Sequence, residues 1–276
     1  MALMSPVTTT KKQPLYLVKL GGEVVEERLA EVAGELAALA ATGARIVVSH
    51  GGGPQVTALS ARLGLSTKMI AGRRLTDEAT LEVVQLAIAG KVNVALQNGL
   101  TSSGLRAVGL TGVIRASKRP AKVLAGAGPE PIDLGHVGDP TGFDVDLVRH
   151  LLDGGYLPVV ACLGRDRDGA VLNINADLVA NQLARALDVD ALVLVTSVPG
   201  VMRDLHDPAS RYGTLTVTEG RALIDSGVAK GGMVAKLDES LSAIVAGVRT
   251  IFILQRDIAA AIARPGTIGT VLLPDR

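Results

Sequence analysis

Residues 45–57 read Arg-Ile-Val-Val-Ser-His-Gly-Gly-Gly-Pro-Gln-Val-Thr, and this stretch decides the fold. The β-branched residues 46–48 predict a short buried strand, which the glycines at 51–53 end, and Pro54 is placed to start a helix. In such a unit the glycines leave backbone N–H groups bare and the helix N-terminus adds partial positive charge, so an anion can bind. A tight turn without a ligand would use the same glycines, so the triplet alone leaves both interpretations open.

The same arrangement occurs earlier in the chain, where the apolar run 15–20 ends in Gly21 and Gly22. Lys19 stands inside this run, with only Leu20 between it and the glycines. A buried ammonium group needs an anionic partner, which makes Lys19 a candidate functional residue; the alternative is that it snorkels from an edge strand. An apolar pattern at steps of four and three predicts a helix over roughly 23–41 between the two strands. We therefore expect a βαβ unit with parallel strands.

The rest of the chain continues this rhythm of strands and helices. We expect helices up to about residue 63, over 79–89 with Thr76 or Asp77 as cap, onward to about 98, and over 144–152, 218–226, 230–246 and 258–264. Strands are expected at 105–110, 157–163, 191–196 and 250–254 and after Gly269, and loops or hairpins at 64–74, 113–137 and 166–169. The pattern predicts an α/β fold, with a lobe boundary near residue 175 where the rhythm restarts.

The composition excludes several classes of protein. A formal net charge of +1 over 276 residues argues against a nucleic-acid groove or a polybasic membrane surface. Gly, Asp and Arg interrupt each apolar stretch before the roughly 18 residues that a membrane helix needs. We therefore expect no nucleic-acid partner and no membrane association. The excess of Ala, Val and Leu is instead expected in a buried parallel sheet and the helices that cover it.

Two further observations concern the cell compartment. Residues 1–14 lack the apolar region of a signal peptide, and they predict a disordered tail on a cytoplasmic protein. The single cysteine, Cys162, excludes an internal disulfide bond. Its place in the apolar run 157–163 favours core packing over a reactive thiol.

Polar residues follow two further elements. Asn175 can cap the helix that begins there, and Asp177 falls in the first turn of that helix. The strand over 191–196 runs into Ser197-Val-Pro-Gly200, a third glycine-containing exit from a strand. Open α/β sheets bind ligands at the carboxyl ends of their strands, so the three exits are expected to face one crevice.

The chain lacks a Walker A sequence, a Gly-x-Gly-x-x-Gly turn and a protein-kinase catalytic loop. Six other motifs are present, in this order: Val18-Lys-Leu-Gly-Gly22, His50-Gly-Gly-Gly53, Gly72-Arg-Arg-Leu-Thr-Asp77, Asn173-Ile-Asn-Ala-Asp177, Thr196-Ser-Val-Pro-Gly-Val201 and Gly231-Gly-Met-Val-Ala-Lys236. From Leu15 to its end the chain resembles the amino-acid kinase family, and within it the members that act on N-acetyl-L-glutamate.

The resemblance implies a three-layer α/β/α sandwich with a mainly parallel central sheet. It implies an acyl-amino-acid-binding lobe at 15–174 and an ATP-binding lobe at 175–276, in one continuous domain that forms homo-oligomers. The activity implied is ATP-dependent phosphorylation of the γ-carboxylate of N-acetyl-L-glutamate in arginine biosynthesis, with Mg²⁺ accompanying ATP.

The resemblance also implies roles for individual residues. The catalytic residues would be Lys19 and Lys236, on either side of the transferred phosphoryl group, and Asp177, which holds both ammonium groups. Gly52 and Gly53 would give N–H donors, Arg74 would pair with the α-carboxylate, and Asn173 would bind the acetylamino end. The nucleotide pocket would be lined by Gly21, Gly22, Ser197, Val198, Pro199, Gly200, Val201, Met202, Val228, Ala229 and Lys230.

This assignment agrees with the chemistry of the reaction. A γ-carboxylate is already ionised at neutral pH and needs no general base, whereas a phosphoryl group passing between two anions needs cations and N–H donors. Lysines supply point charges at the phosphoryl oxygens. Mg²⁺ is expected to be held mainly by the phosphates, so no protein metal site is expected.

The chain departs from the family pattern at three places. Ser197 stands where the family has Asp, the Asp-Gly pair expected after Gly109-Leu-Thr-Gly112 is absent, and Val-Gly-Glu is replaced by Val137-Gly-Asp139. Two of these departures fall in the substrate lobe, so a kinase for carrier-protein-linked α-aminoadipate or glutamate remains an alternative. The basic residues Arg115, Lys118, Arg119 and Lys122 would then recruit an acidic carrier, although a solvated basic edge explains them as well.

A third alternative is a non-catalytic sensor of nucleotide or amino acid with the same fold. It would be favoured by the loss of Lys19, Lys236 or Asp177, and all three are present. Within the family, members sensitive to arginine carry an N-terminal helix that links dimers into a ring. The 14 residues ahead of the first strand have neither helical length nor an apolar stripe. We therefore expect a homodimer that arginine inhibits weakly or not at all.

Overall fold

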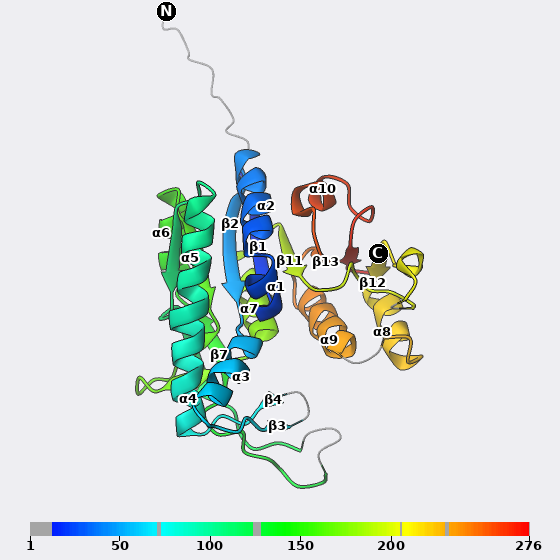
Figure 1. Cartoon of the computed structure of the whole chain (residues 1–276). Coiled ribbons are helices and arrows are strands. Elements are labelled where there is room, and N and C mark those ends of the chain that lie inside the picture. The colour runs from blue at the N-terminus through cyan, green and yellow to red at the C-terminus, as the bar shows by residue number, and fades with distance from the viewer. Residues whose placement is uncertain (1–12, 71–72, 124–127, 205, 230–231, 276) are drawn as a thin grey trace, which may run out of the picture.

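The structure is a computed structural model, and it describes the chain except for residues 1–12, 71–72, 124–127, 205, 230–231 and 276 (Figure 1). Most of the predicted tail, 1–14, and the predicted nucleotide-binding residue Lys230 therefore lie outside the described residues. A large sheet with the strand order β12-β14-β13-β11-β1-β2-β8-β5 forms the centre of the molecule.

The large sheet is mainly parallel, as predicted. Its strands are β12 (Thr214–Thr216), β14 (Thr270–Leu273), β13 (Ile251–Leu254), β11 (Ala191–Val195), β1 (Leu15–Leu20), β2 (Arg45–His50), β8 (Leu157–Ala161) and β5 (Ala107–Leu110). Only β13 and β14 pair in an antiparallel manner. The strands that precede residue 175 form one half of the sheet and the later ones form the other half, with β1 and β11 paired where the halves meet.

Helices cover both faces of this sheet, which confirms the three-layer architecture (Figure 1). On one face lie α2 (Leu29–Ala41), α5 (Asn93–Ser102) and α10 (Ile258–Ala263); on the other lie α6 (Val145–Asp153), α7 (Ala176–Leu187), α8 (Val217–Asp225) and α9 (Gly232–Val245). Because strand side chains alternate, Leu17 joins the core with α7 and α9 and Val18 joins the opposite core. Lys19, two residues after Leu17, therefore points toward α7 and α9.

Two predicted elements are interrupted in the structure. The helix expected over 23–41 is divided at Arg28 into α1 (Gly22–Glu27) and α2, because Arg28 has a φ of −135° and a ψ of 21°, which are not helical. The guanidinium of Arg28 donates to the carbonyl of Gln255, 2.9 Å away. The strand expected over 157–163 stops before Cys162. It resumes as β9 (Leu163–Arg165) in a small sheet with β10 (Val171–Asn173), β6 (Ile114–Lys118) and β7 (Gly138–Phe143), in the order β10-β9-β6-β7. Cys162 itself is buried, as predicted.

A single long helical run replaces the two helices expected after residue 77. It consists of α4 (Glu78–Gln85), a π-helical segment η1 (Leu86–Val92) and α5, and Asp77 caps it by accepting from the N–H of Thr80 at 2.8 Å. Contrary to the sequence expectation, the run Glu78–Ser102 is long and apolar enough to cross a membrane by length and composition. Buried core helices pass the same test, and this run packs Val84 and Leu96 into the interior of the protein.

The remaining elements border the site. Helix α3 (Gly53–Arg62) follows β2, and a short antiparallel hairpin of β3 (Met69–Ile70) and β4 (Arg73–Arg74) follows α3. In Figure 1 this hairpin projects from the main body together with the chain that follows β6. The hairpin confirms the loop or hairpin expected over 64–74.

Candidate active site

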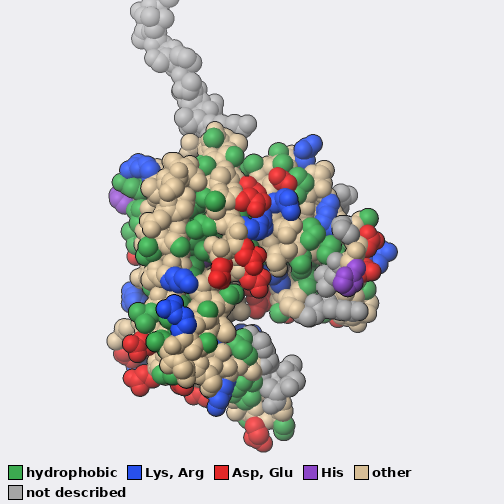
Figure 2. Space-filling model, in the orientation of Figure 1, with side chains coloured by type: hydrophobic (Ala, Val, Ile, Leu, Met, Phe, Trp, Pro, Cys, Tyr) green, Lys and Arg blue, Asp and Glu red, His purple; other side chains and the backbone are tan. Residues whose placement is uncertain are grey.

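Three strands end at the same edge of the large sheet. β11, β1 and β2 are parallel neighbours, so their carboxyl ends bring together Ser197, Gly21 and Gly51. This confirms that the three exits face one region of the molecule. Figure 2 shows the surface notched between the part that carries the β3–β4 hairpin and the part that carries α8 and α9.

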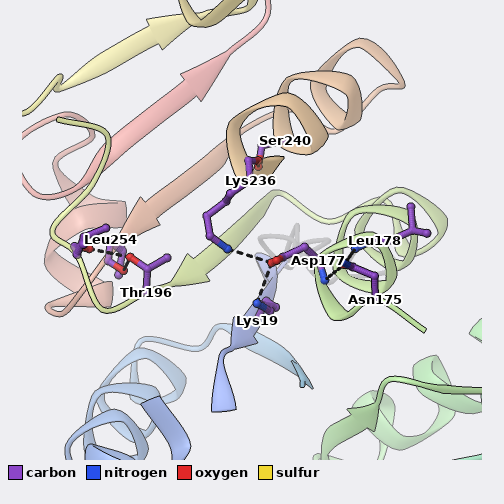
Figure 3. A network of polar contacts seen from close by, with 9 residues as sticks. Lys19, Asn175, Asp177, Leu178, Thr196, Lys236, Ser240 and Leu254 are labelled. Atoms are coloured by element: carbon purple, nitrogen blue, oxygen red, sulfur yellow. Dashed lines mark hydrogen bonds and ion pairs between the residues drawn. The ribbon is translucent and has the colours of Figure 1, made fainter. Parts of the chain in front are cut away.

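Three charged residues meet at this edge. The ammonium of Lys19 lies 2.8 Å from Oδ1 of Asp177, and that of Lys236 lies 3.2 Å from the same oxygen. Figure 3 shows the three side chains converging from β1, α7 and α9. Asn175 fixes the start of α7, since its Oδ1 accepts from the N–H groups of Asp177 and Leu178. Sequence analysis named all three charged residues and the cap, and the structure brings them together.

The pKa values of these residues depend on one another. Burial by itself raises the pKa of Asp177, but the adjacent ammonium groups outweigh it and hold that pKa at about 2. Burial lowers the pKa of Lys236, and the like charge of Lys19 lowers it further. Asp177 is therefore an anion at neutral pH and offsets part of the repulsion between the two cations.

A cavity of about 190 Å³ lies beside this cluster. Its lining includes the glycines of the β2–α3 turn, the guanidinium-bearing residues of the hairpin and the start of α7: Gly51, Gly52, Gly53, Arg73, Arg74, Asn173, Asn175 and Ala176. Gly52 is buried, and among the described residues no acceptor lies within hydrogen-bond reach of the N–H of Gly52 or Gly53. The turn therefore offers two free donors to the cavity.

The side chain of Arg74 is anchored at one end and free at the other. Its Nη2 donates to Oγ1 of Thr57 at 2.9 Å and to the carbonyl of Gly53 at 3.2 Å. Its Nη1 is buried and has no partner among the described residues, and burial lowers the pKa of the guanidinium. A buried donor without a partner is costly, so this geometry favours a ligand with an acceptor group.

Asn173 closes another side of the cavity at the end of β10. Its Nδ2 donates to Oγ1 of Thr76 at 3.1 Å, and its backbone N–H donates to the carbonyl of His136 at 2.9 Å. These contacts fix the residue beside the cavity, where sequence analysis expected the acetylamino end of a substrate to bind.

The residues predicted for the nucleotide lie past the ends of β1 and β11. Ser197 is exposed, whereas Val201, Met202 and Ala229 turn their side chains into the protein. Gly200 has a φ of 154°, and a Cβ there would lie 2.7 Å from Oγ1 of Thr270, so the turn requires glycine. Their contact with a nucleotide stays a prediction, as does that of Gly21, Gly22, Val198, Pro199 and Val228.

The two glycine turns pack directly on each other. A Cβ on Gly22 would lie 2.5 Å from Oε1 of Gln55 and 3.2 Å from the Cα of Gly52. Gln55 joins them, because its Nε2 donates to the carbonyl of Gly22 at 2.8 Å. Sequence analysis did not identify Gln55, although its place one residue after Pro54 in the glycine motif was a usable signal.

Sequence analysis also missed Glu239 and assigned Arg119 only to a basic edge. Glu239 follows Lys236 by one helical turn, and its pKa is raised by burial and then by the charge of Asp177. Arg119 lines the cavity and is paired with Asp139 by three hydrogen bonds. Asp139 stands where the family pattern has Glu, and its pairing still holds the guanidinium of Arg119 in place at the wall of the cavity.

Two of the four residues of the predicted basic segment form ion pairs in the structure, and a third donates to a backbone carbonyl. Lys118 lies 3.1 Å from a carboxylate oxygen of Asp133, and Arg115 donates to the carbonyl of Phe143 at 3.0 Å. With Arg119 bound to Asp139, three of the four basic residues have partners within the protein.

The chain matches the amino acid kinase family over residues 14–255. It is 53% identical over 279 residues to the acetylglutamate kinase of Sorangium cellulosum, with 98% of each chain covered. It is 50% identical over 268 residues to the acetylglutamate kinase of Anaeromyxobacter dehalogenans, covering 94% of this chain and 98% of that one. The structure of the carbamate kinase of Giardia covers 96% of this chain with a TM-score of 0.69 at 18% identity, and this similarity concerns the fold alone.

Proposed function

Because the chain belongs to the amino acid kinase family, we propose that it transfers the γ-phosphoryl group of ATP to the γ-carboxylate of N-acetyl-L-glutamate. The product is N-acetyl-L-glutamyl 5-phosphate, an intermediate of arginine biosynthesis. The observation that supports this most strongly is the pair of ammonium groups on one carboxylate oxygen, beside a cavity with two unpartnered N–H donors.

The cluster supplies what phosphoryl transfer needs. Charge in the transition state spreads over the transferred group and over the attacking and leaving oxygens, so fixed cations stabilise it more than they stabilise the substrates. Lys19 and Lys236 would contact the transferred group from two sides, while Asp177 keeps the ammonium groups at a fixed separation. Gly52 and Gly53 would donate hydrogen bonds to oxygens that gain charge.

The cavity would hold the acyl amino acid. The free Nη1 of Arg74 would bind the α-carboxylate, and Asn173 would bind the acetylamino group. The γ-carboxylate would then lie near the start of α7, since Asn175 and Ala176 line the cavity and Asp177 follows them. This orientation would bring the nucleophile toward the two lysines, which is the main requirement for transfer.

The nucleotide would lie past β11, along Ser197–Met202 and Val228–Lys230. Within the described residues no group of three His, Cys, Asp or Glu side chains could hold a metal ion. Independently of that, Mg²⁺ that accompanies ATP in phosphoryl transfer is held mainly by phosphate oxygens, where it would neutralise charge.

The alternative functions are less well supported. The three charged residues are assembled as a reactive cluster, which a sensor does not require. Recruitment of an acidic carrier protein would need free cations, whereas Arg115, Lys118 and Arg119 have partners within the chain. The curated relatives named above are both acetylglutamate kinases.

We further propose that the protein is a cytoplasmic homodimer. Leu86 and Val94 are 54% and 49% exposed on the helical run Glu78–Ser102, whose opposite side is buried in the protein. Exposed apolar side chains on an otherwise well-packed helix are typical of a surface that is covered in an assembly.

The experiment that tests the function is a coupled assay of ADP release with N-acetyl-L-glutamate, glutamate, aspartate and carbamate as acceptors. We expect turnover with N-acetyl-L-glutamate, and capture of the acyl phosphate by hydroxylamine as a hydroxamate. A higher kcat/KM with any of the other three acceptors would overturn the proposal.

A further inference from the structure

His50 lies at the end of β2, directly before the glycine turn, and it is completely buried. Its Nδ1 lies 2.9 Å from the carbonyl oxygen of Gly51, and its Nε2 lies 2.9 Å from Nδ2 of Asn93. The proposed reaction uses neither ring nitrogen. Because both nitrogens of this fully buried imidazole have partners, the ring is held in one orientation against the glycine turn.

The partners of the ring determine its tautomer. Nδ2 of Asn93 also lies 3.2 Å from the carbonyl of Val159, and a carbonyl requires a donor at that position. Nδ2 is therefore an amide N–H group, and it donates to Nε2 of His50. Nε2 must then be the unprotonated nitrogen, so Nδ1 carries the hydrogen and donates it to the carbonyl of Gly51. Burial lowers the pKa of His50 to about 4, which keeps the ring neutral.

Asn93 is itself held by its surroundings. Its Oδ1 accepts from Nε2 of Gln97 at 2.9 Å, one turn further along α5. The strand β5 leaves room for this pair only because residue 109 is glycine, where a Cβ would lie 1.9 Å from Oδ1 of Asn93. The chain Gln97, Asn93, His50, Gly51 is thus a continuous series of hydrogen bonds that ends at the turn.

The π-helical segment η1 packs the other side of the turn. A Cβ on Gly52 would lie 3.2 Å from both Cγ1 of Ile88 and Cγ2 of Val92. The wider turns of this segment bring these two residues and the adjacent Asn93 to the same side of the helical run, which is a common use of π-helical turns at functional sites. The turn is therefore held by apolar packing at Gly52 and by a hydrogen bond at Gly51.

The peptide group between Gly51 and Gly52 connects this bond to the cavity. In a trans peptide the carbonyl oxygen and the following N–H point in opposite directions. When His50 holds the carbonyl of Gly51, the N–H of Gly52 must point away from the ring, and it is one of the two donors without a partner at the cavity.

We propose that His50, locked as the Nδ1–H tautomer by Asn93, is a positioning residue that aims the N–H of Gly52 at the reacting oxygens. This inference rests on the proposed kinase reaction for its catalytic consequence. Its structural content, the tautomer and the bond to Gly51, does not depend on that reaction. No proton is transferred by His50, and the ring acts only through the peptide that it holds.

Two substitutions at the same position separate the two ring nitrogens. In His50→Asn the amide nitrogen can occupy the place of Nδ1 and keep the bond to Gly51, whereas in His50→Gln the longer side chain reaches the place of Nε2 and loses that bond. We expect His50→Gln to lower kcat by about 10- to 100-fold, and His50→Asn to stay within about threefold of the wild type. The KM for ATP should change in neither variant.

The control is the same pair of substitutions at His150, which is exposed on α6 and distant from the cavity in sequence and fold. His150→Asn and His150→Gln should both leave kcat unchanged. Equal losses of kcat in the two His50 variants, or an equal rise in the KM for ATP, would overturn the positioning role.

A measurement on the wild type decides the structural part even if a variant fails to fold. The chain has 4 histidines, so the ¹⁵N resonances of the imidazole rings can be resolved and that of His50 assigned by elimination. We expect a neutral ring protonated at Nδ1 at neutral pH. An Nε2–H tautomer or an imidazolium at neutral pH overturns the proposal. If the wild type instead fails to phosphorylate N-acetyl-L-glutamate, the proposed function fails, and the tautomer still tests the hydrogen-bond series.

Discussion

The neighbouring strands β1 and β2 each carry a buried titratable side chain near the carboxyl end, Lys19 next to last in β1 and His50 last in β2, but the two side chains differ in charge. Lys19 near the end of β1 is 7% exposed and carries an ammonium group against Asp177. His50 at the end of β2 is 0% exposed and faces a carbonyl and an amide, with no carboxylate in its hydrogen bonds. Both groups lose contact with water, so burial by itself disfavours charge in each.

The difference shows that the partner, and not depth alone, decides whether a buried group is charged. The carboxylate of Asp177 offsets part of the solvation energy that Lys19 loses, whereas the bond to the carbonyl of Gly51 does not outweigh the burial of an imidazolium at His50. The charged end of β1 suits stabilisation of a phosphoryl group. The neutral end of β2 suits orientation of a peptide group.

The largest expected effect is on turnover, when one of the two lysines that bind Asp177 is removed. Lys19→Ala or Lys236→Ala removes one cation from the transition state, and we expect kcat to fall by about 10²-fold or more. Steady-state kinetics with circular dichroism as a check on folding measures this. Lys122→Ala, at an exposed lysine, is the control and should retain full turnover. Near-normal turnover in either folded variant would show that the lysine concerned does not act on the phosphoryl group.

The second effect is on the neutral end and concerns pH. The pKa of His50 is lowered by burial from 6.5 to about 4, so between these values the unfolded chain binds a proton that the folded protein does not. The free energy of unfolding should therefore fall as pH falls from 6.5 to about 4, by roughly 3 kcal/mol in total from this group. Urea unfolding across this range measures it.

The same experiment separates the two strand ends. The pKa of Asp177 is lowered to about 2 from 3.8, so its contribution to stability is complete above 3.8 and is lost between 3.8 and 2. In His50→Asn the free energy of unfolding should fall less steeply between pH 6.5 and 4. The further fall below pH 4, which Asp177 causes, should remain. An unchanged slope above pH 4 in that variant would mean that other groups produce the dependence.

The third effect concerns Arg74, a cation for which the substrate is expected to supply the anionic partner. Arg74 is half-buried at the cavity, and its buried Nη1 has no partner among the described residues, so its partner is expected to be the substrate. The single ammonium of Arg74→Lys cannot both keep the bonds of Nη2 to Thr57 and Gly53 and replace the free Nη1, so it should raise the KM for the acyl amino acid by about 10- to 100-fold with little change for ATP. Arg73→Lys is the matched control. A similar rise in the KM for the acyl amino acid in Arg73→Lys would show that the assignment of the carboxylate to Arg74 is wrong.

The smallest effects compare ion pairs at different depths. The side chain of Arg119 is 11% exposed in its pair with Asp139, whereas that of Arg167 is 92% exposed in its pair with Asp168. Arg119→Met should lower the free energy of unfolding by roughly 1 to 2 kcal/mol, because it leaves a carboxylate without its donors. Arg167→Met should leave the midpoint of thermal unfolding unchanged, since exposed pairs contribute little. Equal losses in the two variants would contradict this ranking.

Much of the fold could be predicted because its signals are local. The β-branched run at 46–48, the glycines after it and Pro54 define a strand, a turn and a helix within ten residues, and β2 and α3 form there. The interruptions could not be predicted in the same way. The helix breaks at Arg28, where φ is −135°, and no Pro or Gly stands at the break to mark it in the sequence.

The sequence by itself determined that β1 and β2 end in glycine turns and that Lys19 is buried and needs an anion, because alternation and turn chemistry act over a few residues. Only the tertiary structure decided how distant side chains meet. Lys236 and Asp177 are 59 residues apart and His50 and Asn93 are 43 apart, and each pair forms because the strand order sets which helix covers which strand end. The protonation states follow from those meetings, since the charge of a buried group depends on the partner that the fold supplies.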